Sequence, residues 1–277
     1  MNSFFPDRYP FLSNPHVTSS NDTSSPLVSI VGAGPGAADL LTVRALHYLG
    51  QAQVVLYDNL VSAEVMALCA PDAELIYVGK KYGDQVDPRQ RQQAINEAMV
   101  AHARQGKRVV RLKSGDPFIF GRAAEEIRYL AEQQVPYEVV PGLTAGLAAA
   151  SLVRISITER NFSNAVLLCT AHTANYDFEQ LDALANMLRT GTTLVMYMGL
   201  SNMPQVVAKL QAAAGPEAVY VSAISQVSGP QQRLVTALLP DVEAALAEAA
   251  LPMPVVFVIG KYACSLDEVA AHLHSVS

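Results

Sequence analysis

The regular alternation of short apolar runs with helical segments is the feature that most constrains the fold, and it begins at residue 27. Short apolar runs bounded by turn residues indicate buried strands, and apolar residues three or four positions apart indicate helices. The predicted elements are, in order, strand Leu27–Val31, helix Leu40–Leu49, strand Val54–Tyr57, helix Ser62–Cys69, strand Leu75–Val78, a helix capped by Asp87 and stopped at Gly106, strand Arg108–Leu112, helix Arg122–Gln134 and strand Tyr137–Val140. Strands separated by helices in this way predict an α/β domain whose parallel sheet is covered on both faces.

The second half of the chain has a different pattern. The predicted elements are helix Thr144–Leu152, strands Val166–Cys169, Thr193–Met198, Val219–Ile224, Arg233–Ala237 and Val255–Ile259, and helices Phe178–Leu188, Met203–Ala213 and Pro240–Ala249. The third and fourth of these strands are expected to pair antiparallel, so this half is predicted to hold a mixed sheet. We therefore divide the chain into a tail of residues 1–26, an N-terminal α/β domain of residues 27–141 and a C-terminal α/β domain of residues 142–277.

The composition narrows the classes of function. Residues 1–26 are rich in Ser, Asn, Pro and Thr and lack a long apolar stretch, so we expect a flexible tail, no signal peptide and a cytoplasmic location. No apolar run reaches the ~18 residues of a membrane span, and the net charge of -6 gives no overall basic field that would attract nucleic acid. The cysteines, Cys69, Cys169 and Cys264, are expected to be small buried apolar residues. No group of His, Cys and Asp has metal-ligand spacing, so no metal is expected.

A glycine-rich turn follows the first predicted strand, with the sequence G-A-G-P-G-A at residues 32–37. It nearly matches the G-x-G-x-x-G/A pattern of dinucleotide-binding folds, and Asp58 lies where a ribose-binding acid would stand. A tight turn with no ligand is the alternative. Asp39 argues against a pyrophosphate, because it places negative charge at the start of the following helix.

Similar turns follow two other strands, S-G-D-P at 114–117 and P-G-L-T-A at 141–145. Ligands of open α/β sheets gather at the carboxyl ends of the strands. Several such turns together suit a compact ligand better than an extended dinucleotide.

Seven segments, taken in order, carry a resemblance to a known family. They are G-A-G-P-G at 32–36, D-L-L-T-V-R at 39–44, Y-D-N-L at 57–60, V-G-K at 78–80, R-L-K-S-G-D-P-F-I-F-G-R at 111–122, V-P-G-L-T-A at 140–145 and Y-M-G at 197–199. Together they resemble the tetrapyrrole methylases, and within that family the members that methylate uroporphyrinogen III. The twelve-residue segment is the most specific of the set.

The resemblance implies a two-domain fold with a methyl-donor cleft between the domains, a homodimer, and S-adenosylmethionine as the donor. The implied reaction methylates uroporphyrinogen III at C2 and C7 to give precorrin-2, which feeds sirohaem, cobalamin or haem d1 synthesis. The implied donor-site residues are Pro35, Ser114, Gly115, Asp116, Ile119, Thr144, Ala145 and Met198. Asp58 and Lys80 match the family's proton acceptor and donor. A carboxylate at a strand end, such as Asp58, is also chemically suited to accept a proton or stabilise positive charge.

The substrate carries many carboxylates, which planar guanidinium groups bind well. Arg111 and Arg122 flank the S-G-D-P loop and are the best candidates for this role, with Arg111 also a candidate for catalysis. Arg160 and His172 lie in other motif loops and are further candidates for substrate binding. A solvated surface charge is the alternative for each arginine.

The sequence departs from the family pattern at several positions. Ser114 and Ala123–Ala124 stand where the family commonly has glycine, and we expect the added methyl groups to narrow the substrate trough. Glu159 replaces a histidine and adds negative charge near the expected path of a polyanion. Three alternatives therefore stay open: a methylase of a later corrinoid intermediate, a dinucleotide-dependent oxidoreductase, and a non-catalytic member that binds the donor or a tetrapyrrole.

Overall fold

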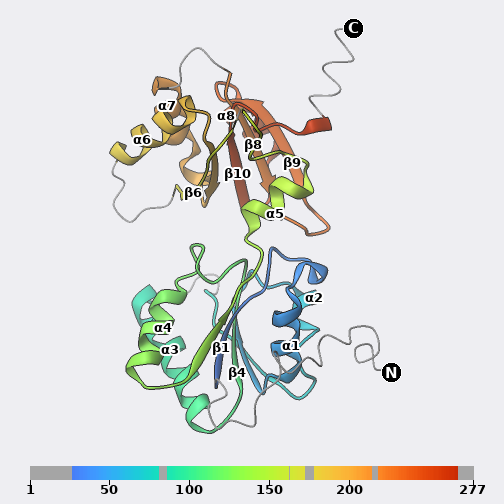
Figure 1. Cartoon of the computed structure of the whole chain (residues 1–277), viewed down its shortest axis with the longest axis vertical. Helices are drawn as coiled ribbons and strands as arrows, with labels where there is room; N and C mark the ends of the chain where they lie inside the picture. Colours follow the sequence, from blue (N-terminus) through green and yellow to red (C-terminus); the bar gives the residue numbers. More distant parts are fainter. Residues whose placement is uncertain (1–26, 81–85, 162, 172–177, 214–217, 268–277) are drawn as a thin grey trace.

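The computed structural model, which describes residues 27–80, 86–161, 163–171, 178–213 and 218–267, contains two five-stranded sheets, one in each half of the chain (Figure 1). The tail and His172 lie outside the described residues. The first sheet has the order β3-β2-β4-β1-β5 and is parallel throughout. The second has the order β6-β7-β10-β8-β9 and is mixed, with β6 parallel to β7 and the other pairs antiparallel.

The first sheet contains β1 (Val28–Gly32), β2 (Val54–Tyr57), β3 (Glu74–Tyr77), β4 (Val109–Lys113) and β5 (Tyr137–Val140). Its helices are α1 (Val43–Gln51), α2 (Ala63–Met66), α3 (Pro88–Arg104) and α4 (Ala123–Glu132), with a short 3-10 helix at Ala38–Leu40. Helices α1 and α2 cover one face and α3 and α4 the other (Figure 1). Asp87 caps α3 by accepting hydrogen bonds from two backbone N–H groups, as its sequence predicts.

The second sheet contains β6 (Val166–Thr170), β7 (Thr193–Tyr197), β8 (Tyr220–Ser225), β9 (Arg233–Leu238) and β10 (Val255–Gly260). Its helices are α5 (Ala145–Leu152), α6 (Phe178–Arg189), α7 (Met203–Ala213) and α8 (Val242–Ala249), with a 3-10 turn at Leu200–Asn202. The predicted antiparallel pairing of β8 with β9 is confirmed. Helix α5 packs its alanines on β7 and β10, on the side nearer the first sheet (Figure 1).

Several predicted helices are shorter than expected, and the first two along the chain are examples. The helix expected from Leu40 begins at Val43, because Thr42 is extended and its hydroxyl accepts a hydrogen bond from the Ala45 N–H. The predicted Ser62–Cys69 helix has a single α-helical turn, residues 63–66. None of the helices in the described part of the chain is long and apolar enough to cross a membrane.

Three glycines bring the strand ends of the first sheet together. Gly32 ends β1, Gly115 and Gly142 follow β4 and β5, and the backbones of the three glycines touch one another. A Cβ on Gly142 would collide with the Gly115 carbonyl oxygen and would lie 2.8 Å from the Gly32 Cα. The turns after β1 and β4 are also joined by two hydrogen bonds between Gly34 and Gly115. This close approach makes a rigid edge at the carboxyl ends of the strands.

Candidate active site between the two sheets

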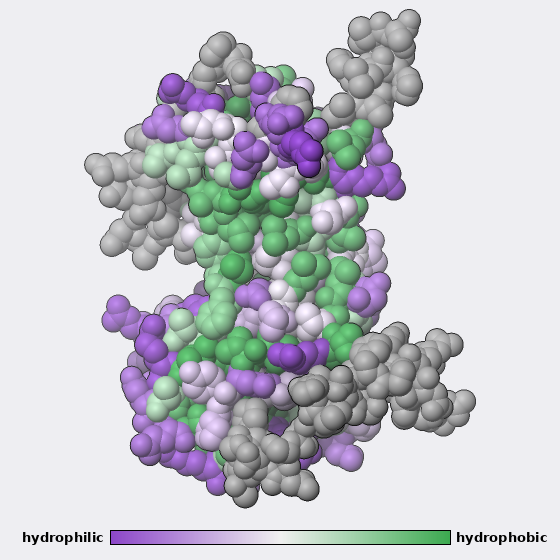
Figure 2. Space-filling model, in the orientation of Figure 1, coloured by the Kyte–Doolittle hydropathy of each residue, from purple (hydrophilic) through white to green (hydrophobic). Residues whose placement is uncertain are grey.

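A cavity of about 450 Å³ lies between the carboxyl ends of the first sheet and the facing strands of the second. Residues after all five strands of the first sheet line it, and residues after β7 and β8 and around the start of β10 close the other side. Hydrophobic residues gather across the middle of the molecule, where the two halves meet (Figure 2). The volume is within the ~300–1,000 Å³ range of ligand-binding cavities.

Most of the residues predicted for the site line this cavity. Those that do are Pro35, Asp58, Lys80, Arg111, Ser114, Gly115, Ile119, Arg122, Thr144, Ala145 and Met198. Asp116 and Arg160 do not line it, and His172 lies outside the described residues.

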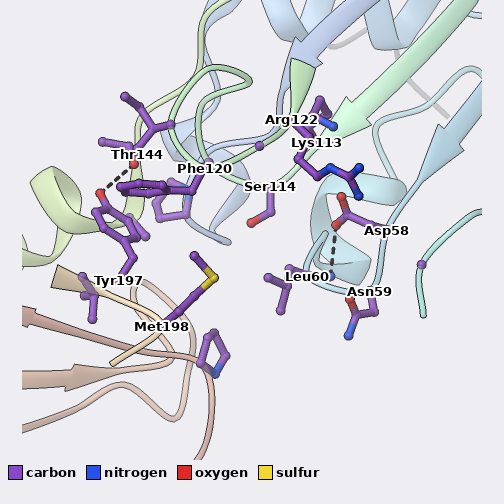
Figure 3. Close-up of a pocket in the computed structure, with 18 of the residues that line it drawn as sticks. Asp58, Asn59, Leu60, Lys113, Ser114, Phe120, Arg122, Thr144, Tyr197 and Met198 are labelled. Atoms are coloured by element: carbon purple, nitrogen blue, oxygen red, sulfur yellow. Dashed lines mark hydrogen bonds between the residues drawn. The ribbon is translucent and has the colours of Figure 1, made fainter. Parts of the chain in front are cut away.

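Asp58 stands at the end of β2 with its carboxylate toward the cavity (Figure 3). Its Oδ1 accepts a hydrogen bond from the Leu60 N–H at 3.3 Å, and its Oδ2 lies 3.7 Å from Nη2 of Arg111. Its side chain is 26% exposed. The carboxylate is therefore held in place by weak contacts and keeps capacity to accept a proton.

Arg111 and Lys113 form the floor of the cavity, but they are buried rather than exposed. Each is 4% exposed, and both donate to Oε1 of Glu126, at 3.1 Å and 3.0 Å. Burial, and next the neighbouring Arg111, lower the pKa of Lys113. Nη1 of Arg111 donates to the carbonyls of Leu56 and Leu112. Few donors of Arg111 remain for a substrate carboxylate, so its placement suits a role through Asp58 better than direct substrate binding.

Arg122 is the exposed guanidinium at the cavity. It donates two hydrogen bonds to the carboxylate of Glu125, at 2.9 Å and 2.7 Å. This hydrogen bonding raises the pKa of Arg122 and lowers the pKa of Glu125. The pair fixes Arg122 near the rim but occupies its Nε and Nη2, so a substrate carboxylate would have to bind at Nη1 or replace Glu125.

The carboxylate of Asp116 accepts hydrogen bonds from two backbone N–H groups. Its Oδ1 accepts from the Phe118 N–H at 2.9 Å, and its Oδ2 accepts from the Gly142 N–H at 3.1 Å. These bonds tie the β4 loop to the turn after β5, and the donor-site role expected of Asp116 stays a prediction. Arg160 is exposed in the loop before β6, away from the residues that line the cavity.

Tyr197, the last residue of β7, joins the second sheet to the segments that follow β4 and β5. Its hydroxyl hydrogen-bonds the Thr144 hydroxyl at 2.8 Å and accepts from the Gly146 N–H at 2.9 Å (Figure 3). Its ring contacts that of Phe120, with centroids 5.0 Å apart. Burial raises the pKa of Tyr197, so it stays a neutral hydrogen-bonding group. The sequence reasoning overlooked Tyr197 and Phe120, although both lie inside the quoted motifs.

Three non-glycine residues that line the cavity have left-handed backbone: Phe120, Arg122 and Met198, with φ of 55°, 59° and 54°. Such conformations are strained for residues with side chains and concentrate at functional sites. Met198 is 45% exposed at the end of β7, and its side chain points toward the space in front of Asp58 (Figure 3).

The departures from the family pattern fall in different places. Ser114 lines the cavity. The expectation that Ala123–Ala124 narrow the trough is wrong, because Ala123 is buried in the core beneath α4 and Ala124 points to solvent. Glu159 is exposed, pairs with Ser163 through its backbone, and does not line the cavity.

The contacts of the glycine turn disfavour a dinucleotide. The N–H groups of Gly34 and Ala37 donate to the Gly115 carbonyl and the Ser228 hydroxyl, so they are already used within the protein.

Burial raises the pKa of Cys169 to about 12, which keeps this thiol protonated and unsuited to nucleophilic catalysis. In the described part of the chain, no three His, Cys, Asp or Glu side chains could hold a metal ion together.

The chain was compared with protein families and curated proteins. The model of the tetrapyrrole (corrin/porphyrin) methylases matches residues 27–243. A siroheme synthase of Methylobacillus flagellatus is 41% identical over 238 residues, which is 84% of this chain and 49% of that protein. A siroheme synthase of Azotobacter vinelandii is 40% identical over 243 residues, 88% of this chain and 51% of that protein. The chain thus spans about half the length of the curated relatives it matches.

Solved structures agree with this result. A uroporphyrin-III C-methyltransferase from Thermus thermophilus, complexed with S-adenyl homocysteine, is 34% identical, with a TM-score of 0.69 over 85% of this chain and 97% of that one. A cobalt precorrin-4 methyltransferase of cobalamin biosynthesis is 28% identical, with a TM-score of 0.74 over 84% of this chain and 95% of that one. The sequence, the two-sheet fold and these matches together show that the chain belongs to the tetrapyrrole methylases.

Proposed function

We propose that this chain transfers methyl groups from S-adenosylmethionine to carbon atoms of uroporphyrinogen III, at C2 and C7, giving precorrin-2. The observation that carries the proposal is the cavity itself, which a strand-end carboxylate, Asp58, and the exposed Met198 line from opposite sides (Figure 3). The similarity to the Thermus thermophilus enzyme and to the siroheme synthases supports the choice of substrate.

The residues at one end of the cavity fit the donor. Pro35, Met198 and Val227 supply apolar surface, and Gly115 and Ala145 bring backbone into the lining. Apolar walls with a few backbone polar groups suit an adenosine, whose rings are flat and whose edges need hydrogen bonds. When bound, the donor supplies an electrophilic methyl group on a sulfonium.

The protein's own residues then have two tasks. One is alignment: holding two reactants in attack geometry can supply ~7–11 kcal/mol of the barrier. The other is proton removal, because methylation of a substituted pyrrole carbon leaves the rest of the ring positively charged, and this cation must lose a proton from its nitrogen or from a neighbouring carbon. We assign the acceptance of that proton to Asp58, a role that its position in the cavity lining supports. We assign the binding of substrate carboxylates to Lys80 and Arg122, which also line the cavity.

The proposal is tested by anaerobic incubation of the purified chain with uroporphyrinogen III and S-adenosylmethionine, followed by mass spectrometry of the tetrapyrrole. A gain of two methyl groups is expected. A later corrinoid substrate is the second candidate, favoured by the TM-score of 0.74 to the cobalt precorrin-4 methyltransferase. Methylation of that enzyme's substrate without methylation of uroporphyrinogen III would establish the second candidate in place of the first.

The hydroxyl of Tyr197 is expected to be needed for donor binding. Tyr197→Phe removes the partner of the Gly146 N–H and of the Thr144 hydroxyl, beside the predicted donor residues. Leaving such groups unpaired costs about 1–3 kcal/mol. We expect this cost to loosen the segment that carries Thr144 and Ala145 and so to raise the Kd for S-adenosylhomocysteine about tenfold. Isothermal calorimetry measures it, with the exposed Tyr137→Phe as a control. An unchanged Kd in Tyr197→Phe would separate the hydroxyl from the donor site.

The family resemblance also supports a homodimer that works in the cytoplasm on a small-molecule substrate, without nucleic acid or membrane partners. Exposed Leu147 and Leu152 on α5, together with the apolar band in Figure 2, offer surface that a second copy could cover. Light scattering at several protein concentrations tests the dimer, and a monomer mass at every concentration would reject it.

A further inference from the structure

A cluster of buried charges lies directly beneath the cavity. Arg111 and Lys113 are alternate residues of β4, so their side chains leave the same face of the sheet, the face covered by α3 and α4. There Glu126 of α4 is fully buried, and its Oε1 accepts from Arg111 Nε, Lys113 Nζ and Gln92 Nε2, at 3.1, 3.0 and 3.3 Å. Its other oxygen, Oε2, is buried with no hydrogen-bond partner among the described residues.

Such a cluster is a poor way to stabilise a fold. Burying two cations and a carboxylate costs desolvation energy that their attraction only partly returns, and apolar residues of the same size often serve as well. The unpaired Oε2 adds a further cost. The arrangement is therefore better explained by what it does at the cavity, which Arg111 and Lys113 line from below.

The negative charge of Glu126 affects how strongly Arg111 and Lys113 attract the Asp58 carboxylate. Arg111 is locked by Glu126 at Nε and by two backbone carbonyls at Nη1, and its Nη2 faces the Asp58 carboxylate at 3.7 Å. That distance is longer than the ~2.7–2.9 Å of a close charged hydrogen bond. Because Glu126 neutralises much of the charge of Arg111 and Lys113, Asp58 is not drawn into the floor as their only counter-ion.

We propose that Glu126 is a positioning residue for methyl transfer, which keeps Arg111 seated and leaves the Asp58 carboxylate free to face the substrate. The inference rests on the proposed function, since it assigns Asp58 a part in that reaction. It gives Glu126 no contact with donor or substrate, because Glu126 does not line the cavity.

The first test is a double-mutant cycle of Glu126→Gln with Asp58→Asn, measured by single-turnover methyl transfer. Glu126→Gln alone is expected to lower the rate by about 10- to 100-fold, the range for residues that orient a catalytic group. The Kd for S-adenosylhomocysteine is expected to stay within about twofold. In the Asp58→Asn background, Glu126→Gln should lower the rate no further, and an equal loss in both backgrounds would overturn the proposal. Glu132→Gln, an exposed change on the same helix, is the control.

The second test needs no activity. In a crystal structure of Glu126→Gln, the Arg111–Asp58 distance is expected to shorten from 3.7 Å to ~2.8 Å, and an unchanged distance would overturn the proposal. If Glu126→Gln does not fold, the same double-mutant cycle is measured with Glu126→Asp, because the shorter side chain displaces Arg111. Glu126→Asp must then lower the rate of methyl transfer in the wild-type background and not in the Asp58→Asn background. A wild-type rate in Glu126→Asp counts against the proposal. Methyl transfer by the wild-type protein is measured first, so that failure of the proposed function is distinguished from failure of the proposal for Glu126.

Discussion

Asp58→Asn should lower kcat by about 10²- to 10⁴-fold, the usual contribution of a positioned proton acceptor. The substitution keeps the size of the side chain and an oxygen that can accept from the Leu60 N–H, so the turn after β2 should be preserved. It removes the capacity to take a proton beside the cavity. The Kd for S-adenosylhomocysteine should stay unchanged, because the predicted donor residues lie in the turns after β1, β4, β5 and β7.

The measurement is kcat for methyl transfer to uroporphyrinogen III, together with calorimetry of the donor product. Asp72→Asn is a suitable control, because Asp72 is exposed at the opposite end of β3 from the cavity. A wild-type kcat in Asp58→Asn would remove Asp58 from proton transfer. A raised Kd with a normal kcat would place Asp58 in donor binding instead.

The sequence was sufficient to predict the two halves of the fold. Strands with near-continuous apolar residues, such as Val54–Tyr57, are buried on both faces and are recognisable for that reason. The antiparallel β8–β9 pair could be predicted because its strands are close in the chain. The order of the strands could not, since it depends on contacts between distant segments that no local pattern records.

The candidate site was predicted largely through its turns. Turns after the strands of a parallel sheet must meet at one edge, so the turns could be grouped in advance. The choice of Pro35, Gly115 and Thr144 within them came from the family resemblance, and all three line the cavity. The burial of Arg111 and its pairing with Glu126 could not be predicted, because an arginine in a strand is normally expected at the surface. The lining from Met253 to Val256 was also missed, since it reads as the start of a core strand.

Gly142→Ala should destabilise the protein more than any surface change, because the new methyl group would meet backbone that cannot move aside. It would collide with the Gly115 carbonyl oxygen and crowd Gly32, so the turns after β1, β4 and β5 would have to separate. We expect a loss of about 3 kcal/mol, the upper part of the range for overpacking, and a fall in Tm of roughly 10 °C.

Two other glycines provide matched controls for this clash. Gly50 lies in α1, where an added Cβ meets nothing within 4 Å, so Gly50→Ala should raise Tm slightly through helix propensity. Gly106 also has open space but a φ of +75°, so Gly106→Ala should cost about 1–2 kcal/mol from backbone strain alone. Thermal unfolding of the three variants separates the effects. If Gly142→Ala lowers Tm by no more than Gly106→Ala does, the contact between the turns is looser than the structure shows. The expected result would mean that three glycines without room for a side chain fix the edge of the first sheet that carries Asp58 and the S-G-D-P loop.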